Sequence, residues 1–286
     1  RLVRAERGAR FMTTPVALGL AGLAVVLGLW WSLRIAWWRR PLPWRRPRVL
    51  MYHMVREHRP GARFNKLRVR PAEFERQVAW LRAKGFTFVF ASRLFENEPL
   101  PARSVCLTFD DGYADNLEHA DPVLERHGAC ATLYLVEERD GGWSSKKKAH
   151  HSDDELAGEP KLTDEQVRAM VASGRWELGG HTRTHAMLTA LPDDAAREEI
   201  ESARRTFPER FGAHPATFAY PFGIFGEKHS AMAREAGYIG AVTTEPGVPA
   251  APTADPMRTP RVKVSGREGM LAFRVRLRDG RRGWRK

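Results

Sequence analysis

From residue 48 onward, short apolar runs alternate with amphipathic segments, and this alternation limits the folds that the chain can adopt. Most of the runs lack a strict polar–apolar alternation, as is typical of parallel strands buried on both faces. Seven alternations over about 240 residues favour one α/β domain, with a barrel preferred to an open sheet. We predict strands at 49–53, 86–91, 105–109, 130–136, 176–180, 217–221 and 239–244.

The segments between these runs carry helix signals. Residues 71–85 begin with Pro71, place apolar residues on one face and end at Gly85. Thr163 resembles an N-cap at the start of a second helix, which ends at Gly174. Residues 193–207 predict a long charged helix outside the sheet.

Residues 139–161 interrupt the pattern with polar, glycine-containing sequence, and we predict a surface loop inserted after a strand. Two histidines and two aspartates lie close together in this loop and could bind a metal ion. We favour a solvated loop over that alternative. The four side chains are His150, His151, Asp153 and Asp154.

The N-terminal region contains an uncharged apolar stretch, residues 15–33, followed by several tryptophans. Its length is enough to cross a bilayer core, and tryptophan favours the membrane interface. A cleaved signal peptide is the alternative, but the bulky residues that follow favour retention. We therefore predict that residues 1–47 form a single-pass anchor and basic linker of the bacterial inner-membrane type. Arginines after the span favour a cytoplasmic domain, whereas the family resemblance described below favours the opposite face.

The formal net charge of +13 is concentrated at the two ends of the chain. We interpret it as contact with a membrane surface, because the sequence shows no nucleic-acid-binding motif between the basic ends. The segment 267–286 is predicted to be a basic C-terminal tail. The two cysteines, Cys106 and Cys130, lie in apolar runs and are interpreted as buried small side chains.

Two pairs of polar residues follow predicted strands and suggest a catalytic site. Asp110 and Asp111 end one strand, and His181 and His185 follow another. Because active sites form where parallel strands end, these pairs can converge. Two histidines and one carboxylate bind a divalent cation and leave room for water and substrate. One aspartate would then bind the metal, and the other would accept a proton from water.

Three ordered motifs carry a family resemblance. The stretches TFDDG, HTRTH and FAYPFG resemble the first three motifs of the polysaccharide deacetylases, the NodB-homology domain of carbohydrate esterase family 4. The resemblance extends from about residue 49 to 244, and we place the domain at 48–266. It implies a distorted (β/α)7 barrel that uses a metal ion to remove N- or O-acetyl groups from sugars.

The resemblance also implies roles for individual residues. Asp110 would be the general base, and Asp111, His181 and His185 would bind one divalent ion. In this family the ion is usually zinc, with nickel, cobalt or iron as alternatives. A backbone N–H would assist the oxyanion. The acetyl pocket would be lined by Tyr220, Pro221, Phe222 and Gly223.

The sequence departs from the family pattern in two places. The third motif lacks the arginine that usually orients the base. Arg261 is the candidate to replace it, and a structural or surface role for Arg261 is the alternative. The late motif that supplies a histidine acid is missing, because no histidine follows His229. His53, at the end of the first strand, could donate the proton instead, or could simply pack the barrel. These traits resemble the branch that acts on poly-N-acetylglucosamine and similar membrane-associated glycans.

We therefore expect a metal-dependent hydrolase that removes N-acetyl groups from the amino sugars of a polysaccharide or membrane-linked glycan. Alternatives are a deacylase or deformylase of a lipid-linked sugar, an O-acetyl esterase, and a non-catalytic glycan-binding barrel. The intact set of two aspartates and two histidines argues against the last of these. The expected partners are an N-acetylated glycan or glycolipid and, through the N-terminal helix, a membrane, whereas nucleic acid is not expected.

Overall fold

The computed structural model describes residues 14–36, 38–139, 154–250 and 254–281. The chain divides into two units, which are Arg1–Arg39 with Arg282–Lys286, and Arg40–Arg281. In the first unit, helix α1 (Thr14–Ile35) contains the apolar window Val16–Leu33, with a mean hydropathy of 2.1. Among the described residues this is the one helix with the length and composition to span a membrane, and a signal sequence near an N-terminus would have the same properties.

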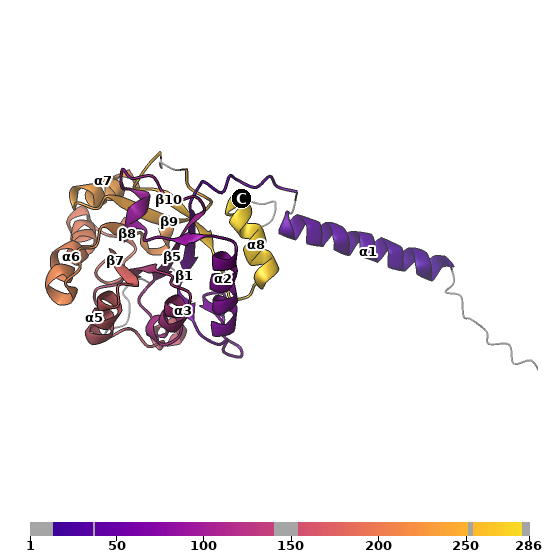
Figure 1. Cartoon of the computed structure of the whole chain (residues 1–286), viewed down its shortest axis with the longest axis horizontal. Helices are drawn as coiled ribbons and strands as arrows, with labels where there is room; N and C mark the ends of the chain where they lie inside the picture. Colours follow the sequence, from indigo (N-terminus) through magenta and orange to yellow (C-terminus); the bar gives the residue numbers. More distant parts are fainter. Residues whose placement is uncertain (1–13, 37, 140–153, 251–253, 282–286) are drawn as a thin grey trace, which may run out of the picture. The chain divides into compact units, whose positions relative to one another are not determined.

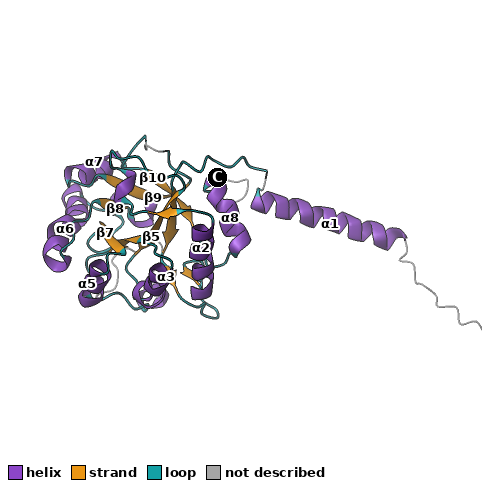
Figure 2. Cartoon of the chain, in the orientation of Figure 1, coloured by secondary structure: helices purple, strands orange, loops and turns teal. Residues whose placement is uncertain are grey.

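The second unit is a closed barrel of seven parallel strands surrounded by helices (Figures 1 and 2). Strand β1 pairs with both β5 and β10, which closes the ring. This confirms the fold class expected from the sequence. The barrel strands are β1 (Arg48–Tyr52), β5 (Ser104–Asp110), β6 (Ala131–Leu135), β7 (Trp176–Gly180), β8 (Thr217–Ala219), β9 (Gly240–Pro246) and β10 (Thr259–Lys263).

One strand prediction is confirmed only in part. Residues 86–91 contribute only the short strand β4 (Thr87–Phe88), and the seventh barrel strand is β10, which the sequence analysis missed. After β4 the N–H of Val89 still donates to the carbonyl of Val105 on β5 at 3.0 Å, and Val89 and Ala91 pack with apolar side chains of the barrel strands, including Val49 and Val242. Strand β10 was not predicted because a proline, an arginine and a lysine interrupt its apolar pattern. A separate pair, β2 (Met54–Val55) and β3 (Arg68–Val69), lies outside the barrel sheet.

The helices cover the outer face of the barrel, where strand residues such as Leu50 and Phe109 pack against Phe74 and Leu81 of α2. Helix α2 begins at Pro71 and ends just before Gly85, which has a φ of 73°, as the sequence predicts. The predicted Thr163 cap is also confirmed, since its side chain and that of Gln166 form a reciprocal capping box. The α-helices are α2 (Pro71–Ala83), α3 (Asp121–Arg126), α4 (Asp154–Ala157), α5 (Asp164–Ala172), α6 (Asp193–Phe211), α7 (Glu227–Glu235) and α8 (Met270–Asp279). Shorter turns are η1 (Ser92–Leu94), the π-helical η2 (Asn116–Ala120), η4 (Leu188–Ala190) and η5 (Pro221–Gly223).

The compact unit extends beyond the predicted domain limits at both ends. Residues 267–286 were expected to be a basic tail, but α8 lies there and buries Phe273 and Leu277 against the core. Four-residue spacing places these two side chains on one face. Arg276 is buried beside them, where it pairs with Glu268 and donates to the carbonyl of Lys263. At the other end, the buried Arg48 donates to the carbonyls of Leu42 and Leu277, which joins the linker to α8.

The predicted polar loop at 139–161 is only partly a surface segment. Arg139 and Glu159, at its two ends, are buried within the domain. Residues 140–153, with His150, His151 and Asp153 of the alternative metal site, lie outside the described residues, and for Asp154 only the backbone of α4 is described. Cys106 is a buried free thiol and Cys130 a half-buried one.

Candidate metal centre

Asp111, His181 and His185 come together at the C-terminal ends of β5 and β7. One carboxylate oxygen of Asp111 lies 3.3 Å from Nε2 of His181 and 3.4 Å from Nε2 of His185. All three side chains are buried, and one ligand atom from each lies within 4.8 Å of the others. Among the described residues this is the one group of histidine and acidic side chains that could hold an ion. Its donor set of two imidazole nitrogens and one carboxylate fits a divalent cation such as Zn²⁺.

The three groups shift one another's pKa values. Burial raises the pKa of Asp111, but its contacts with His181 and His185 outweigh burial and hold that pKa well below its usual value. Burial lowers the pKa of His185, and the net shift is downward. For His181, the contact with Asp111 overcomes burial, so its pKa is raised. The ring of His181 is oriented by a 2.7 Å contact between Nδ1 and the carbonyl oxygen of Ala219.

Asp110 points to a different partner. Both of its carboxylate oxygens accept hydrogen bonds from the guanidinium of Arg261, each at 2.7 Å. Burial raises the pKa of Asp110, but the charge and hydrogen bonds of Arg261 lower it by more. The net pKa is below its usual value, so the carboxylate stays ionised. Arg261 has 0% exposure and also donates to Thr108 Oγ1 and to the carbonyl of Thr243, both at 2.9 Å. The arginine on the missed strand β10 is therefore the partner of Asp110.

His53 follows β1 and is half-buried. Strands β1 and β5 are parallel and pair Tyr52 with Phe109, so His53 follows β1 at the end of the barrel where Asp110 ends β5. Its backbone carbonyl accepts a 2.9 Å hydrogen bond from Asn116. The neighbouring carboxylate of Asp115 accepts one from the N–H of Val55 at 2.8 Å. The structure thus brings His53 to the rim that holds the other site residues.

The predicted acetyl-pocket residues lie in two different environments, the core of the domain and the candidate metal centre. The ring of Tyr220 is fully buried, stacks on Phe225 with centroids 4.0 Å apart and belongs to the core beneath α7. Phe222 instead contacts the His185 ring, with centroids 4.8 Å apart. Pro221 is buried beside it. A Cβ on Gly223 would meet Thr244 Oγ1 at 2.1 Å, so the close approach of this turn to β9 requires glycine.

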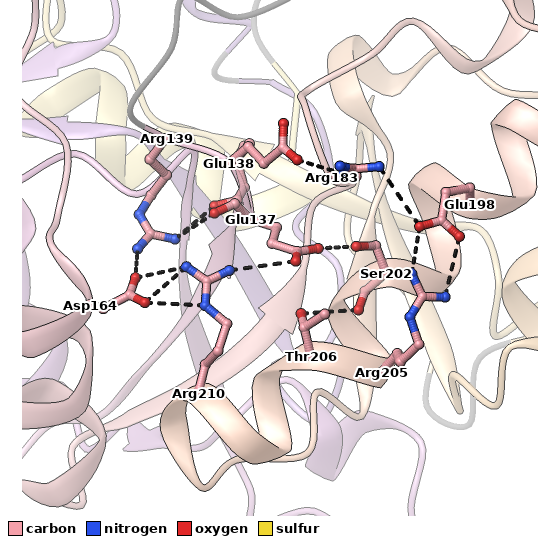
Figure 3. Close-up of polar contacts among 11 residues, drawn as sticks. Glu137, Glu138, Arg139, Asp164, Arg183, Glu198, Ser202, Arg205, Thr206 and Arg210 are labelled. Carbon is pink, nitrogen blue, oxygen red and sulfur yellow. Dashed lines mark hydrogen bonds and ion pairs between the residues drawn. The ribbon is translucent and has the colours of Figure 1, made fainter.

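The sequence analysis missed the polar residues that support the site. Asn116 donates to the carbonyl of His53, and Asp115 accepts the N–H of Val55 on the following strand β2. Glu199 on α6 holds the loop between the two histidines. Farther along α6, Arg210 lies 2.9 Å from Asp164 and 3.5 Å from Glu137 (Figure 3). The polar residues after the predicted strand 105–109 and the charged helix at 193–207 were visible in the sequence. Neither feature indicates which groups these side chains contact.

Three comparisons place the chain among known proteins. The family model described as polysaccharide deacetylase matches residues 97–241, half of the chain. YxkH of Bacillus subtilis (strain 168) is 30% identical over 253 residues, which cover 87% of this chain and 77% of YxkH. The chain belongs to the polysaccharide deacetylase family.

Further relatives agree with this assignment. The poly-β-1,6-N-acetyl-D-glucosamine N-deacetylase of Staphylococcus epidermidis is 26% identical over 239 residues, covering 76% of this chain and 78% of that protein. The solved structure of IcaB from Ammonifex degensii superposes with a TM-score of 0.66 at 23% identity, covering 82% of this chain and 97% of that one. The first relative supports a deacetylase hydrolase, and the second shows the same fold.

Proposed function

We propose that this protein is a metal-dependent hydrolase that removes N-acetyl groups from the amino sugars of a polysaccharide or membrane-linked glycan. The observation that carries the proposal is the buried group of Asp111, His181 and His185 beside the Asp110–Arg261 pair. The Staphylococcus epidermidis relative, whose name specifies a poly-N-acetylglucosamine substrate, supports the choice of sugar. When bound, a divalent ion supplies Lewis acidity to a hydrolytic site.

The protein's own residues account for the proton transfers. Asp110, kept ionised by Arg261, accepts a proton from the attacking water. Water adds to the acetyl carbon, the carbon–nitrogen bond breaks, and the sugar nitrogen takes up a proton as it leaves. His53 is the residue that we assign as the donor of that proton, with Asp110 returning its own as the alternative. Phe222, in contact with the His185 ring, borders the space for the acetyl group.

The first experiment measures metal content and acetate release by the full chain on oligomers of β-1,6-linked N-acetylglucosamine. We expect about one ion per chain and a loss of both properties in His181→Ala and His185→Ala, because a site short of a ligand binds much more weakly. His119→Ala removes an exposed histidine and serves as the control. Unchanged metal content in both ligand variants would disprove the site.

A second experiment tests the proton donor. If His53 protonates the leaving nitrogen, His53→Ala slows amide hydrolysis strongly but spares an aryl acetate, whose leaving group needs no proton. Rates on a glucosamine amide and on an aryl acetate are measured with the same protein preparation. An equal loss on both substrates removes His53 from the chemical step.

A further inference from the structure

The loop that carries the two histidines has an unusual backbone. Thr182 has a φ of 65° and His185 a φ of 59°, in the left-handed region that is uncommon for residues other than glycine. Residues in this conformation are strained and persist only where the surroundings hold them. The metal ligands are therefore presented by a loop that needs external support.

Part of this support comes from residues 137 and 138, which follow strand β6. The N–H of Glu137 donates to the carbonyl of Thr182 at 3.3 Å, and the N–H of Glu138 donates to that of Arg183 at 2.8 Å. These bonds extend the β6–β7 pairing past the ends of both strands and hold the first half of the loop. The second half, which leads to His185, lies beyond them.

Helix α6 holds this second half through the side chain of Glu199. The carboxylate of Glu199 accepts the backbone N–H of Thr184 at 2.9 Å with one oxygen and the Thr184 hydroxyl at 2.7 Å with the other. The carbonyl of Glu199 also accepts the N–H of Arg183 at 3.1 Å. Hydrogen bonds to an ionised carboxylate are among the stronger ones in proteins. Glu199 thus binds the residue immediately before His185 at two points.

The two histidines differ in what orients them. The ring of His181 has its own contact with the carbonyl of Ala219. His185 itself has a positive φ, and its ring packs edge-on against Phe222. Because Thr184 immediately precedes His185 in the chain, a displacement of Thr184 would move His185 directly.

We propose that Glu199 is a positioning residue that holds His185 in its metal-binding place through Thr184. This inference rests on the proposed metal site and adds to it a determinant of metal affinity on a helix that contributes no ligand. Partners that orient metal ligands typically change affinity by about 10–100-fold when they are removed.

The test compares metal affinities of the full chain, measured by competition with a chromophoric zinc chelator. We expect Glu199→Gln and Thr184→Val each to weaken Zn²⁺ binding by about 10-fold or more. Thr184→Ser keeps the hydroxyl and should retain the wild-type affinity. Because the Thr184 hydroxyl acts here through the Glu199 carboxylate, the double variant should be little weaker than Glu199→Gln alone.

Glu201→Gln is the matched control, since Glu201 lies on the same helix and pairs only with Arg197 among the ion pairs of the described residues. Its affinity should equal that of the wild type. Amide hydrogen exchange at residues 181–185 of the metal-free protein should be faster in Glu199→Gln than in this control. A folded Glu199→Gln variant that binds Zn²⁺ within twofold of the wild type overturns the proposal. If that variant does not fold, equal affinities of Thr184→Val and Thr184→Ser overturn it.

The two proposals fail in different ways. A wild-type chain that binds Zn²⁺ but releases no acetate contradicts the proposed function, while the affinity comparison still decides the role of Glu199. A wild-type chain that binds no Zn²⁺ contradicts both.

Discussion

At the scale of single residues, Arg261 and Asp110 form a buried ion pair inside the barrel, with side-chain exposures of 0% and 4%. Removing one partner of such a pair leaves a buried charge, which typically costs about 3–5 kcal/mol of stability. The pair also sets the protonation of Asp110, whose pKa burial would otherwise raise. Arg261 therefore acts on both folding and the proposed base.

We predict that Arg261→Met destabilises the protein by about 3–5 kcal/mol and that Asp110→Asn in the same chain recovers part of the loss, because the unpaired carboxylate is then removed. Urea unfolding of the two single variants and the double variant measures this coupling. Additive losses would show that the pair has no energetic link. In Arg261→Met, the acid limb of any acetate-release profile should also move to higher pH.

Asp115 provides a pH-dependent prediction. Burial raises its pKa to about 7 from an ordinary value of 3.8, although the Val55 N–H opposes the shift. The unfolded chain releases this proton at lower pH than the folded one, so the stability associated with it is full below about pH 4 and is lost as pH rises through 7.

Asp115→Asn removes this titration while keeping an oxygen for the Val55 N–H. We therefore expect the difference in melting temperature between the variant and the wild type to favour the variant more at pH 8 than at pH 4. Thermal melts at the two pH values measure the difference. An equal effect of the substitution at both values contradicts the raised pKa.

At the scale of secondary-structure elements, α8 is part of the barrel's outer layer. Phe273 is 4% exposed and packs against Trp80 of α2, with ring centroids 6.3 Å apart. Leu271, two residues earlier, is 55% exposed. The same short helix thus offers a buried and an exposed apolar side chain.

We predict that Phe273→Ala lowers the free energy of unfolding by about 3–5 kcal/mol, the usual range for a buried phenylalanine. Leu271→Ala should change it by less than about 0.5 kcal/mol, as is usual for surface sites. Chemical denaturation of both variants provides the comparison. Similar small effects in both would mean that α8 does not contribute to the core in solution.

At the scale of the whole molecule, we propose that the apolar window Val16–Leu33 anchors the protein in a membrane. The full chain should then stay with the membrane fraction after an alkaline carbonate wash and be released by detergent. Recovery of a soluble chain that has lost residues 15–33 would instead identify a signal peptide. A topology reporter at the C-terminus would determine which side of the membrane the barrel occupies, and hence which glycans it can reach.

Local sequence patterns were sufficient to predict much of this molecule. Short apolar runs in the sequence located β5 and β7. The polar residues that follow these strands converge as Asp111, His181 and His185. Proline, glycine and capping signals located α2 and α5. Such features depend on neighbours a few residues away, so the linear chain displays them directly.

Tertiary structure alone decided the features that depend on distant partners. Arg261 reaches Asp110 across 151 residues, from a strand whose own pattern is too polar to recognise. Glu199 meets Thr184, and α8 buries Phe273, only because the closed barrel brings their elements together. A charged residue on a helix looks the same in the sequence whether it faces water or a strained loop. The partner that distinguishes these two cases is chosen by packing.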